Sequence, residues 1–389
     1  MSLMFRSLVT GTALALTLSS AAVAFDTRAR AAFVMDQTTG TVLLAKDADL
    51  ALPPASMSKL MTLYIAFEAI RDGRLQLDER LPVSAHAMSF GGSTMFLDTT
   101  DRVKVEDLLR GVIVLSGNDA CVVLAEALSP DGTEAGFARL MTQRAQQLGM
   151  TSSTFKNASG WPAQGHVMSM RDLTLLATRI IGDFPEFYPM FSERKFEFDG
   201  RAPSNVNNRN PLLGLVNGAD GLKTGHTAEA GYGLVGSAKN GERRVVFAIT
   251  GLDSTRARAE ESEAIVNWAF RQFAEQTVVT KGASIARAEV WMGSAEHVDL
   301  VSDKDVTLLL PTMSAEGIKA EVVYTGPIQA PVSKGQKLAE LIIQPDGLPE
   351  TRVPLFAAEK VDAGGFLDRM MTVSSLLIKR FAEDAEEAM

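Results

Sequence analysis

The chain has 389 residues, more than one small domain needs and enough for two. Hydrophobic residues make up 46% and charged residues 22%, the balance of a packed globular protein rather than a disordered one. The net charge of −9 excludes the basic footprint of a nucleic-acid-binding protein, and four histidines with one cysteine argue against a zinc site.

The first 24 residues have the pattern of an export signal. Arg6 precedes an apolar run from Leu8 to Leu18, and small residues at 22 and 24 form a cleavage site. The alternative is an uncleaved anchor, for which the uncharged stretch is short. We therefore expect cleavage of residues 1–24 and export to the periplasm. Cys121 has no disulfide partner, and its apolar surroundings predict a buried, inert thiol.

A hairpin and then a helical region come next. Apolar runs at 32–35 and 41–44 predict an N-terminal β-hairpin. From Ser56 the apolar residues recur with helical spacing until Gly73 ends the run. Residues 105–182 are expected to be mostly helical. The clearest helical patterns cover 105–115, 119–128 and 134–149.

Strands return after Gly221. The runs 232–238 and 244–250 surround Asn240-Gly241, the strongest short signal for a β-hairpin. A closing helix is then predicted from the spacing of Ala264, Ile265, Trp268, Ala269 and Phe273. Residues 25–275 therefore predict an α+β domain, an antiparallel sheet flanked by helices.

The last part of the chain changes pattern. Residues 276–362 contain short alternating runs separated by turn residues, which predicts a small all-β domain. Residues 363–389 carry one apolar stripe and an acidic tail. The stripe fits an amphipathic helix on a membrane surface, and the alternative is that it docks on the β-rich domain. Apolar burial would then drive membrane association, because the segment is net acidic.

The first candidate for chemistry is Ser56-Met57-Ser58-Lys59. Ser-x-x-Lys alone is weak evidence, since ~1–2 copies are expected by chance at this length. Two further copies begin at Ser153 and Ser192, and we take them as surface accidents. The first copy opens a helix, so both side chains lie on one face, a turn apart. The alternative is that Ser56 only caps the helix.

Two more motifs follow in order, Ser116-Gly117-Asn118 and Lys223-Thr224-Gly225. Each is expected fewer than ~0.1 times by chance. Separately, the first could be a polar loop and the second an edge-strand lysine before a turn. Together with the first motif, they predict one active site.

A serine hydroxyl needs a base to act as a nucleophile. No histidine stands in a motif position, and a lysine can serve only if its pKa falls from about 10.4. Burial and a neighbouring cation both lower a lysine pKa. We assign Lys59 as the base for Ser56, and Lys223 as the cation that keeps it neutral and attracts a substrate anion. Which lysine carries the charge stays open, because such a pair can titrate jointly.

Other motif residues have expected roles. Ser116 can pass a proton to the leaving nitrogen. Asn118 can donate its amide to a substrate carbonyl or to the lysine base. The backbone N–H groups of Ser56 and His226 are the candidate oxyanion donors. Gly225 would let a substrate approach the strand backbone.

These motifs resemble those of the low-molecular-mass penicillin-binding proteins, the D-alanyl-D-alanine carboxypeptidases of the penicillin-binding protein 5 type. The sequences around Ser56, Ser116 and Lys223 are similar to this family's extended motifs, as is Asn208-Arg209-Asn210. The similarity runs from about Phe33 to the C-terminal helix.

The resemblance implies a β-lactamase/transpeptidase-like catalytic domain, a β-rich domain and a C-terminal membrane anchor. It implies attack of Ser56 on the D-Ala-D-Ala bond of a peptidoglycan stem peptide, then hydrolysis of the acyl-enzyme, without metal or cofactor. β-Lactams would acylate the same serine. By resemblance, Arg209 and Thr224 help to hold the terminal carboxylate, beside Lys223, Gly225 and His226. The protein would then lie on the outer face of the cytoplasmic membrane.

Three other functions are compared with these motifs by their own sequence requirements. A class A β-lactamase needs a Glu-x-x-Leu-Asn loop, and no Glu between Ser116 and Lys223 has Asn four residues on. A D,D-endopeptidase would share the motifs and differ in loop shape. A non-catalytic wall-binding or morphology protein would not need a serine with paired lysines. His86, His166 and His297 have no motif role and are expected at exposed or hydrogen-bonded positions.

Overall fold

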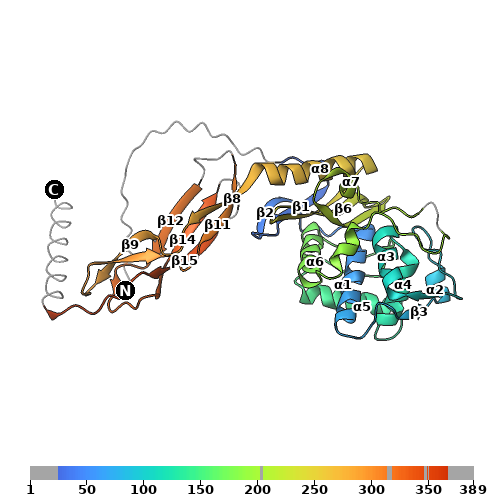
Figure 1. The fold of residues 1–389 in the computed structure, drawn as a ribbon, viewed down its shortest axis with the longest axis horizontal. Coiled ribbons are helices and arrows are strands. Elements are labelled where there is room, and N and C mark those ends of the chain that lie inside the picture. The colour runs from blue at the N-terminus through green and yellow to red at the C-terminus, as the bar shows by residue number, and fades with distance from the viewer. Residues whose placement is uncertain (1–24, 202–204, 313–317, 346–347, 349, 367–389) are drawn as a thin grey trace.

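The computed structural model describes most of the chain after residue 24. The described ranges are 25–201, 205–312, 318–345, 348 and 350–366. The predicted export signal and the part of the predicted C-terminal helix beyond Phe366 lie outside these ranges. Figure 1 shows two units, with helix α8 (Thr255–Gln272) running from the first toward the second.

The first unit is built on a sheet to which distant parts of the sequence contribute. Its described strands follow the order β2-β1-β7-β6-β5, and all neighbours are antiparallel. The strands are β1 (Ala31–Asp36), β2 (Thr41–Lys46), β5 (Ala219–Thr227), β6 (Gly231–Asn240) and β7 (Arg243–Leu252). Both predicted hairpins, β1-β2 and β6-β7, are confirmed. Strand β5, which carries Lys223, lies at an edge of the sheet.

Side chains of the sheet alternate between two cores, as the period of a strand requires. Phe33 and Val246 belong to the larger core, which the sheet shares with the helical region. Their neighbours Val34 and Phe247 belong to a smaller core that also contains Ile265 of α8. The sheet is therefore covered by helices on both faces.

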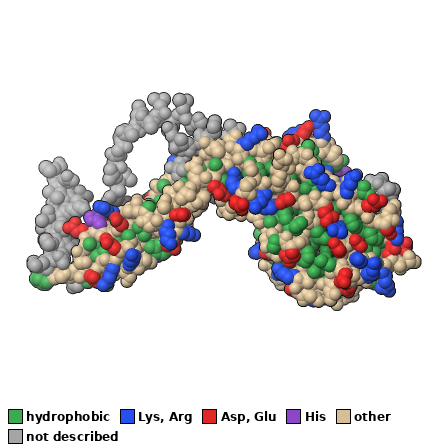
Figure 2. Space-filling model, in the orientation of Figure 1, with side chains coloured by type: hydrophobic (Ala, Val, Ile, Leu, Met, Phe, Trp, Pro, Cys, Tyr) green, Lys and Arg blue, Asp and Glu red, His purple; other side chains and the backbone are tan. Residues whose placement is uncertain are grey.

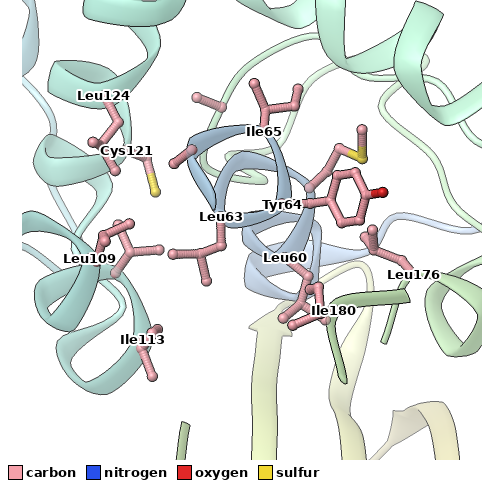
Figure 3. Packing of buried hydrophobic residues seen from close by; sticks show 14 of the residues in the cluster. Leu60, Leu63, Tyr64, Ile65, Leu109, Ile113, Cys121, Leu124, Leu176 and Ile180 are labelled. Carbon is pink, nitrogen blue, oxygen red and sulfur yellow. The ribbon is translucent and has the colours of Figure 1, made fainter. Parts of the chain in front are cut away.

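Helix α1 (Lys59–Arg71) runs through the middle of the larger core. Its residues are buried on nearly every side, which is typical of a central helix. Figure 3 shows Leu63 pointing toward Leu109 and Ile113, and Tyr64 toward Leu176. Gly73, where the sequence predicts the end of the helical run, lies two residues beyond the helix with a φ of 73°.

Further helices surround α1, largely where the sequence predicts them. They are α3 (Val105–Arg110), α4 (Asn118–Leu128), α5 (Glu134–Gln147) and α6 (Met170–Asp183). One departure is η2 (Gly111–Leu115), a π-helical turn inside the stretch predicted as one helix. The shorter elements are η1 (Ala55–Ser58), β3 (Arg80–Pro82), α2 (Ala85–Met88), β4 (Arg102–Lys104), η3 (Tyr188–Ser192) and α7 (Leu212–Leu215).

The closing helix α8 is confirmed, with two differences in detail. Ile265 and Ala269 are buried as predicted, but Ala264 is exposed and Val266 takes its place against the sheet. Phe273 begins strand β8 instead of ending the helix. The helical spacing continues into a residue that the next domain uses as a strand, so periodicity alone could not locate this boundary.

The second unit is all-β in its described residues, as predicted. One sheet has the order β12-β14-β15-β10-β9-β13, and a separate pair joins β11 to β8. The strands are β8 (Phe273–Val279), β9 (Ser284–Trp291), β10 (His297–Val301), β11 (Val306–Pro311), β12 (Ile318–Tyr324), β13 (Ile328–Gln329), β14 (Lys337–Pro345) and β15 (Thr351–Ala357). Leu309 of β11 joins the same core as Phe273 and Ala269, so the two units share apolar contacts where they meet.

Charged side chains are scattered over the face shown in Figure 2, with acidic and basic groups interspersed on both units. Among the described residues, no helix combines the length and apolar character needed to cross a membrane.

Candidate active site

The proposed nucleophile lies in the tight turn that precedes α1. Ser56 is half-buried in η1, next to Ala55, whose backbone has a φ of 48°. The Lys59 Nζ atom lies 2.9 Å from Ser56 Oγ. Neither η1 nor α1 begins with a side-chain capping hydrogen bond, so the structure does not support the helix-cap alternative.

Lys59 is fully buried and its amine touches three oxygen atoms. Besides Ser56 Oγ, Nζ lies 2.7 Å from Asn118 Oδ1 and 2.5 Å from the Ser159 carbonyl oxygen. Burial lowers the pKa of Lys59 to about 8, and the charge of Arg209 contributes in the same direction. The sequence predicts Lys223 as the neighbouring cation. In the structure burial is the largest cause, Arg209 adds to it, and the interaction of Lys59 with Lys223 disfavours the charge on both lysines.

Lys223 and Ser116 form a second hydrogen-bonded pair beside the first. Lys223 Nζ donates to Ser116 Oγ at 3.0 Å and to the Thr224 carbonyl at 3.3 Å. Burial holds the pKa of Lys223 well below its usual value, and the charge of Lys59 lowers it further. Each lysine is therefore costly to charge, which is the behaviour of a jointly titrating pair.

Asn118 connects the Lys59 amine to the loop that contains Gly91. Its Oδ1 accepts from Lys59, while its Nδ2 donates to the Gly91 carbonyl at 2.8 Å. The expectation that the amide of Asn118 donates to Lys59 was wrong, because an amine proton needs the carbonyl side of the amide. The backbone N–H of Asn118 also donates to the Ser93 carbonyl at 2.7 Å.

The backbone of Ser116 has a strained conformation. It ends the π-helical turn η2 and has a left-handed conformation, φ 62° and ψ 33°, which is uncommon for a residue other than glycine. Such strain is held in place by surrounding contacts. One contact is the N–H of Gly117, which donates to the Gly111 carbonyl at 2.9 Å. The sequence pattern predicts a regular helix over 105–115 and does not indicate the π turn.

Asp119 holds the loop over the site. Its buried carboxylate accepts from the backbone N–H groups of Met95 at 3.0 Å and Leu97 at 3.1 Å. Burial raises the pKa of Asp119, and these hydrogen bonds oppose the rise. The three sequence motifs do not indicate this role for Asp119. The only signal was an acidic residue directly after Ser-Gly-Asn.

Strand β5 packs closely on the serine turn. A Cβ on Gly225 would lie 2.9 Å from the Pro54 carbonyl oxygen and 3.0 Å from Met57 Cγ. We expected this glycine to make room for a substrate, but the space is filled by the serine turn. Gly160 also packs closely against the serine turn, since a Cβ there would collide with the Ala55 carbonyl oxygen.

A basic group borders the site beyond Ser116. Arg209 Nη2 donates to Ser93 Oγ at 2.8 Å and to the Leu115 carbonyl at 2.6 Å. Buried Arg258 approaches it, with Nη2 3.4 Å from the Arg209 carbonyl oxygen, and its Nε has no hydrogen-bond partner among the described residues. Burial and the charge of Arg209 lower the pKa of Arg258 to about 10. Sequence reasoning missed Arg258, which stands on α8 without a motif.

The His226 side chain stacks on an aromatic ring. Its ring lies over Tyr232 with the ring centroids 3.9 Å apart, and the Arg258 guanidinium lies 5.7 Å from the centre of the Tyr232 ring. The two stacked residues face each other in the β5-β6 register. The stack fixes the end of β5 next to Lys223. Thr224, between Lys223 and Gly225 on the strand, is buried.

Residues outside the motifs mostly match expectation. Cys121 is buried, and burial raises the pKa of its thiol to about 12, which makes it inert. His297 is exposed, and His86 lies 3.0 Å from Glu134. His166 matches it in part, because its buried ring accepts a hydrogen bond at Nδ1 from the Lys156 N–H at 3.3 Å, while its Nε2 has no partner among the described residues.

The other Ser-x-x-Lys copies do not contribute to the site. Ser192 is exposed and donates to the Pro189 carbonyl at 2.8 Å. Ser153 was expected at the surface but is buried, and it donates to Asp172 at 2.7 Å. In the described part of the chain, no group of His, Cys, Asp or Glu side chains is arranged to hold a metal ion.

An antiparallel sheet between helices, a serine paired with a buried lysine, and a trailing all-β domain define a class that comparison with known proteins identifies. Residues 17–254 match the family described as D-alanyl-D-alanine carboxypeptidase, and residues 273–363 match the penicillin-binding protein 5 C-terminal domain. The chain belongs to the D-alanyl-D-alanine carboxypeptidase family. The predicted resemblance is confirmed.

Individual relatives support the same assignment. The chain is 37% identical over 351 residues to D-alanyl-D-alanine carboxypeptidase DacC of Escherichia coli, covering 88% of this chain and 86% of the relative. It is similar to the crystal structure of penicillin-binding protein 5 from Haemophilus influenzae, with a TM-score of 0.70, 31% identity and coverage of 87% and 98%. The chain is also similar to the ampicillin-bound crystal structure of penicillin-binding protein D2 from Listeria monocytogenes. The TM-score is 0.56 and the sequence identity 33%, and the match covers 63% of this chain and 98% of that one.

Proposed function

We propose that this chain is a serine-type D-Ala-D-Ala carboxypeptidase that removes the terminal D-alanine from peptidoglycan stem peptides through an acyl-enzyme on Ser56. One observation carries the proposal, namely that the buried Lys59 amine contacts both Ser56 Oγ and Asn118 Oδ1, beside the Lys223–Ser116 pair. Membership of the family supports the substrate class.

The contacts of Lys59 explain how it can act as a base. A neutral amine has two N–H bonds and one lone pair. The two N–H bonds match the Asn118 Oδ1 and Ser159 carbonyl acceptors, which leaves the lone pair for the hydroxyl proton of Ser56. Ser56 Oγ then bonds to the carbonyl carbon of the penultimate D-alanine while its proton passes to Lys59.

The leaving group needs a proton when the peptide bond breaks. Ser116 can donate its hydroxyl proton to the leaving nitrogen, and Lys223, which touches its oxygen, can replace that proton. Before hydrolysis the proton on Lys59 returns to Lys223, which restores the neutral amine. Water, deprotonated by Lys59, then attacks the ester carbon, and Lys59 passes that proton to the departing Ser56 oxygen. The released products are D-alanine and the shortened peptide.

The remaining site residues bind charge on the substrate. The N–H groups of Ser56 and His226 are the proposed oxyanion donors, and each such donor typically contributes ~10²–10³ in rate. We assign the terminal carboxylate to Arg209, Thr224 and Lys223, because a carboxylate bound beside Lys223 favours its ammonium form. Arg258 supports this assignment, because it adds a second guanidinium, which is buried and has no carboxylate partner among the described residues.

The proposal includes covalent inhibition by β-lactams at Ser56. A β-lactam presents a carbonyl and a carboxylate like those of the D-Ala-D-Ala end, so the same groups can bind it. The similarity to the ampicillin-bound protein from Listeria supports this reading.

We further infer that the protein works outside the cytoplasmic membrane. The pattern at 1–24 supports export, and the apolar stripe at 363–389 supports attachment to the outer face of the membrane. In this reading residues 25–275 carry catalysis, and residues 276–362 separate the active site from the membrane surface.

The direct test is release of free D-alanine from diacetyl-L-lysyl-D-Ala-D-Ala by the purified protein. We expect release by the wild type, none by Ser56→Ala, and labelling of Ser56 by a fluorescent penicillin. Absence of both release and labelling in the wild type would remove the enzyme proposal. Cleavage of crosslinked peptides without release of D-alanine would instead favour the D,D-endopeptidase.

A further inference from the structure

The Lys59 amine takes one of its acceptors from the backbone, the Ser159 carbonyl oxygen at 2.5 Å. The direction of the lone pair of a neutral amine depends on where its two N–H bonds point. Ser159 is fully buried in the segment 157–160, which contains none of the three motifs. The contacts that hold this segment in place therefore also orient the base.

Asn157 shapes the 157–160 segment from within. Its Oδ1 accepts hydrogen bonds from the N–H groups of Ser159 at 3.2 Å and Gly160 at 2.8 Å. These bonds join residues of the segment to one another. They do not fix the position of the segment relative to Lys59.

Two other hydrogen bonds anchor the segment to helices, and both act on Ala158. Its carbonyl accepts from Thr62 Oγ1 at 2.7 Å, on the same helix α1 that carries Lys59. Its N–H donates to Oε1 of Glu134 at 3.0 Å, and Glu134 is the first residue of α5. Ala158 is fully buried, so a lost partner is costly because water does not replace it.

Glu134 is a buried carboxylate that the proposed catalytic steps do not use. Its side chain is only 10% exposed, and a buried glutamate is rare unless it is paired. Its second oxygen, Oε2, lies 3.0 Å from Nε2 of His86 on α2. An ionised carboxylate only accepts hydrogen bonds, so His86 Nε2 carries the hydrogen. Both oxygens of Glu134 are engaged, which fixes the carboxylate against Ala158.

We propose that Glu134 is a positioning residue for the lysine base. It holds the 157–160 segment, so that the Ser159 carbonyl stays against one N–H of the neutral Lys59 amine. The lone pair of that amine then stays directed at the Ser56 hydroxyl. This inference rests on the proposed function and adds a residue to the site that lies outside the three motifs.

The test separates the reach of the Glu134 side chain from its charge. Glu134→Gln keeps the reach and an acceptor oxygen, and its amide can donate to His86 when the ring hydrogen moves to Nδ1. Glu134→Asp keeps the charge but is one methylene shorter, so it cannot hold Ala158 and His86 together. Aspartate suits the first turn of a helix, so α5 is kept. Acylation of Ser56 by a fluorescent penicillin is measured for each variant between pH 6 and 10.

We expect Glu134→Gln to be acylated within about threefold of the wild-type rate, with a pH midpoint near that of the wild type. Glu134→Asp should be acylated at least about tenfold more slowly at the high-pH plateau, because the amine is no longer held in line with the hydroxyl. Its midpoint should also fall by roughly 0.5–1 unit. The reason is that the ammonium form of Lys59 loses an acceptor that it uses more strongly than the neutral amine does.

The other groups that act on the charge of the Lys59 amine are unchanged in both variants. They are the charges of Asp119, Arg209 and Lys223, and the thiol of Cys121. Since Glu134→Asp also keeps its own charge, a lower midpoint in this variant reports on hydrogen bonding.

Asp172 provides the matched control. It is also a buried carboxylate in the first turn of a helix, α6, and it accepts a backbone hydrogen bond from Ser152 at 2.9 Å. Ser152 precedes the 157–160 segment. Asp172→Asn should therefore lower the melting temperature but leave both the acylation rate and the midpoint unchanged.

An unchanged rate in Glu134→Asp would overturn the inference. A slower rate with an unmoved midpoint would also overturn it, because loss of structure alone has this effect. Two further contradictory results are effects confined to Glu134→Gln, which would mean that charge and not reach matters, and equal effects of Asp172→Asn.

Failure of the proposed function is a different result, since penicillin would then not label the wild type at all. The pKa of Lys59 can still be followed in that case by NMR of isotope-labelled lysine in Ser56→Ala. A lower pKa after addition of Glu134→Asp, but not of Glu134→Gln, would support the positioning role, and equal pKa values in all three proteins would overturn it.

Discussion

The charge of the Lys59 amine depends on more than its burial. After burial, the charge of Arg209 contributes to its low pKa, so Arg209→Gln should move that pKa upward from about 8. The pH midpoint of Ser56 acylation by a penicillin should rise, while Arg209→Lys, which keeps the positive charge, should leave it near 8. Acylation rates measured between pH 6 and 10 check this. An unchanged midpoint in Arg209→Gln would contradict it, because loss of substrate binding alone changes the plateau.

Gly160 supports the serine turn through its missing side chain. Its φ is +77°, and a Cβ would collide with the Ala55 carbonyl oxygen. Gly160→Ala should therefore destabilise the protein by more than 2 kcal/mol, a backbone cost of about 1 plus a packing cost of about 1–3 kcal/mol, and slow penicillin labelling at least about tenfold. Urea unfolding and labelling kinetics measure both effects.

Gly73 offers a matched control for this change. It has a similar φ of +73° and nothing within 4 Å of a built Cβ. Gly73→Ala should cost only the backbone part, about 1 kcal/mol, with normal labelling. If Gly160→Ala and Gly73→Ala lose the same stability and are labelled at the same rate, the contact of Gly160 with Ala55 does not support the serine turn.

The loop that contains Met95 and Leu97 is attached to helix α4 through the carboxylate of Asp119. Asp119→Asn keeps the shape of the side chain but weakens its hydrogen bonds to the Met95 and Leu97 N–H groups. Hydrogen bonds to a charged group contribute about 1.5–3 kcal/mol, so we expect a loss of stability of this order and slower labelling of Ser56. Thermal unfolding and limited proteolysis within 89–97 report on the loop.

Asp131 gives the comparison for that substitution. It also accepts a backbone hydrogen bond, from Thr133, but in an exposed loop. Asp131→Asn should cost less than about 1 kcal/mol and leave labelling unchanged. Equal effects of the two substitutions would show that Asp119 does not hold the site together.

The sequence predicted the elements and motifs well because both depend on local patterns. The hairpins, α1 and the all-β unit follow from periodicity, and Ser56, Lys59, Ser116, Asn118 and Lys223 follow from three motifs in order. The structure places these residues in two adjacent hydrogen-bonded groups.

What the sequence did not predict depends on tertiary contacts. The Ser159 carbonyl touches the lysine amine across 100 positions of sequence, and no side-chain type marks a carbonyl. Arg258 reaches the site from a helix in which arginines are common at the surface. The π turn before Ser116 is held by packing against Met95, beyond the reach of helical periodicity.

The whole molecule depends on the contact between its two units. Leu309, only 2% exposed, packs from β11 into the core that contains Phe273 and Ala269. Leu309→Ala should cost about 2–5 kcal/mol in unfolding of the full chain, as large-to-small core substitutions do. Penicillin labelling should persist, because the active site lies in the first unit.

Val323 provides the exposed control in the same unit. It is 45% exposed on strand β12, so Val323→Ala should change stability by less than about 0.5 kcal/mol. Chemical denaturation of both variants compares them. A Leu309→Ala protein as stable as Val323→Ala would show that the two units are not coupled through this core.

The proposed catalysis depends on a neutral Lys59 amine beside the Ser56 hydroxyl. The most direct measurement is the pH dependence of Ser56 acylation by a penicillin, in the wild type and in Lys59→Arg. We predict that the wild-type rate falls about tenfold per pH unit below a midpoint near 8, the pKa of Lys59. Lys59→Arg, whose guanidinium stays protonated, should acylate at least ~10²-fold more slowly at every pH. A wild-type rate that is constant from pH 6 to 9, with Lys59→Arg equally fast, would contradict it.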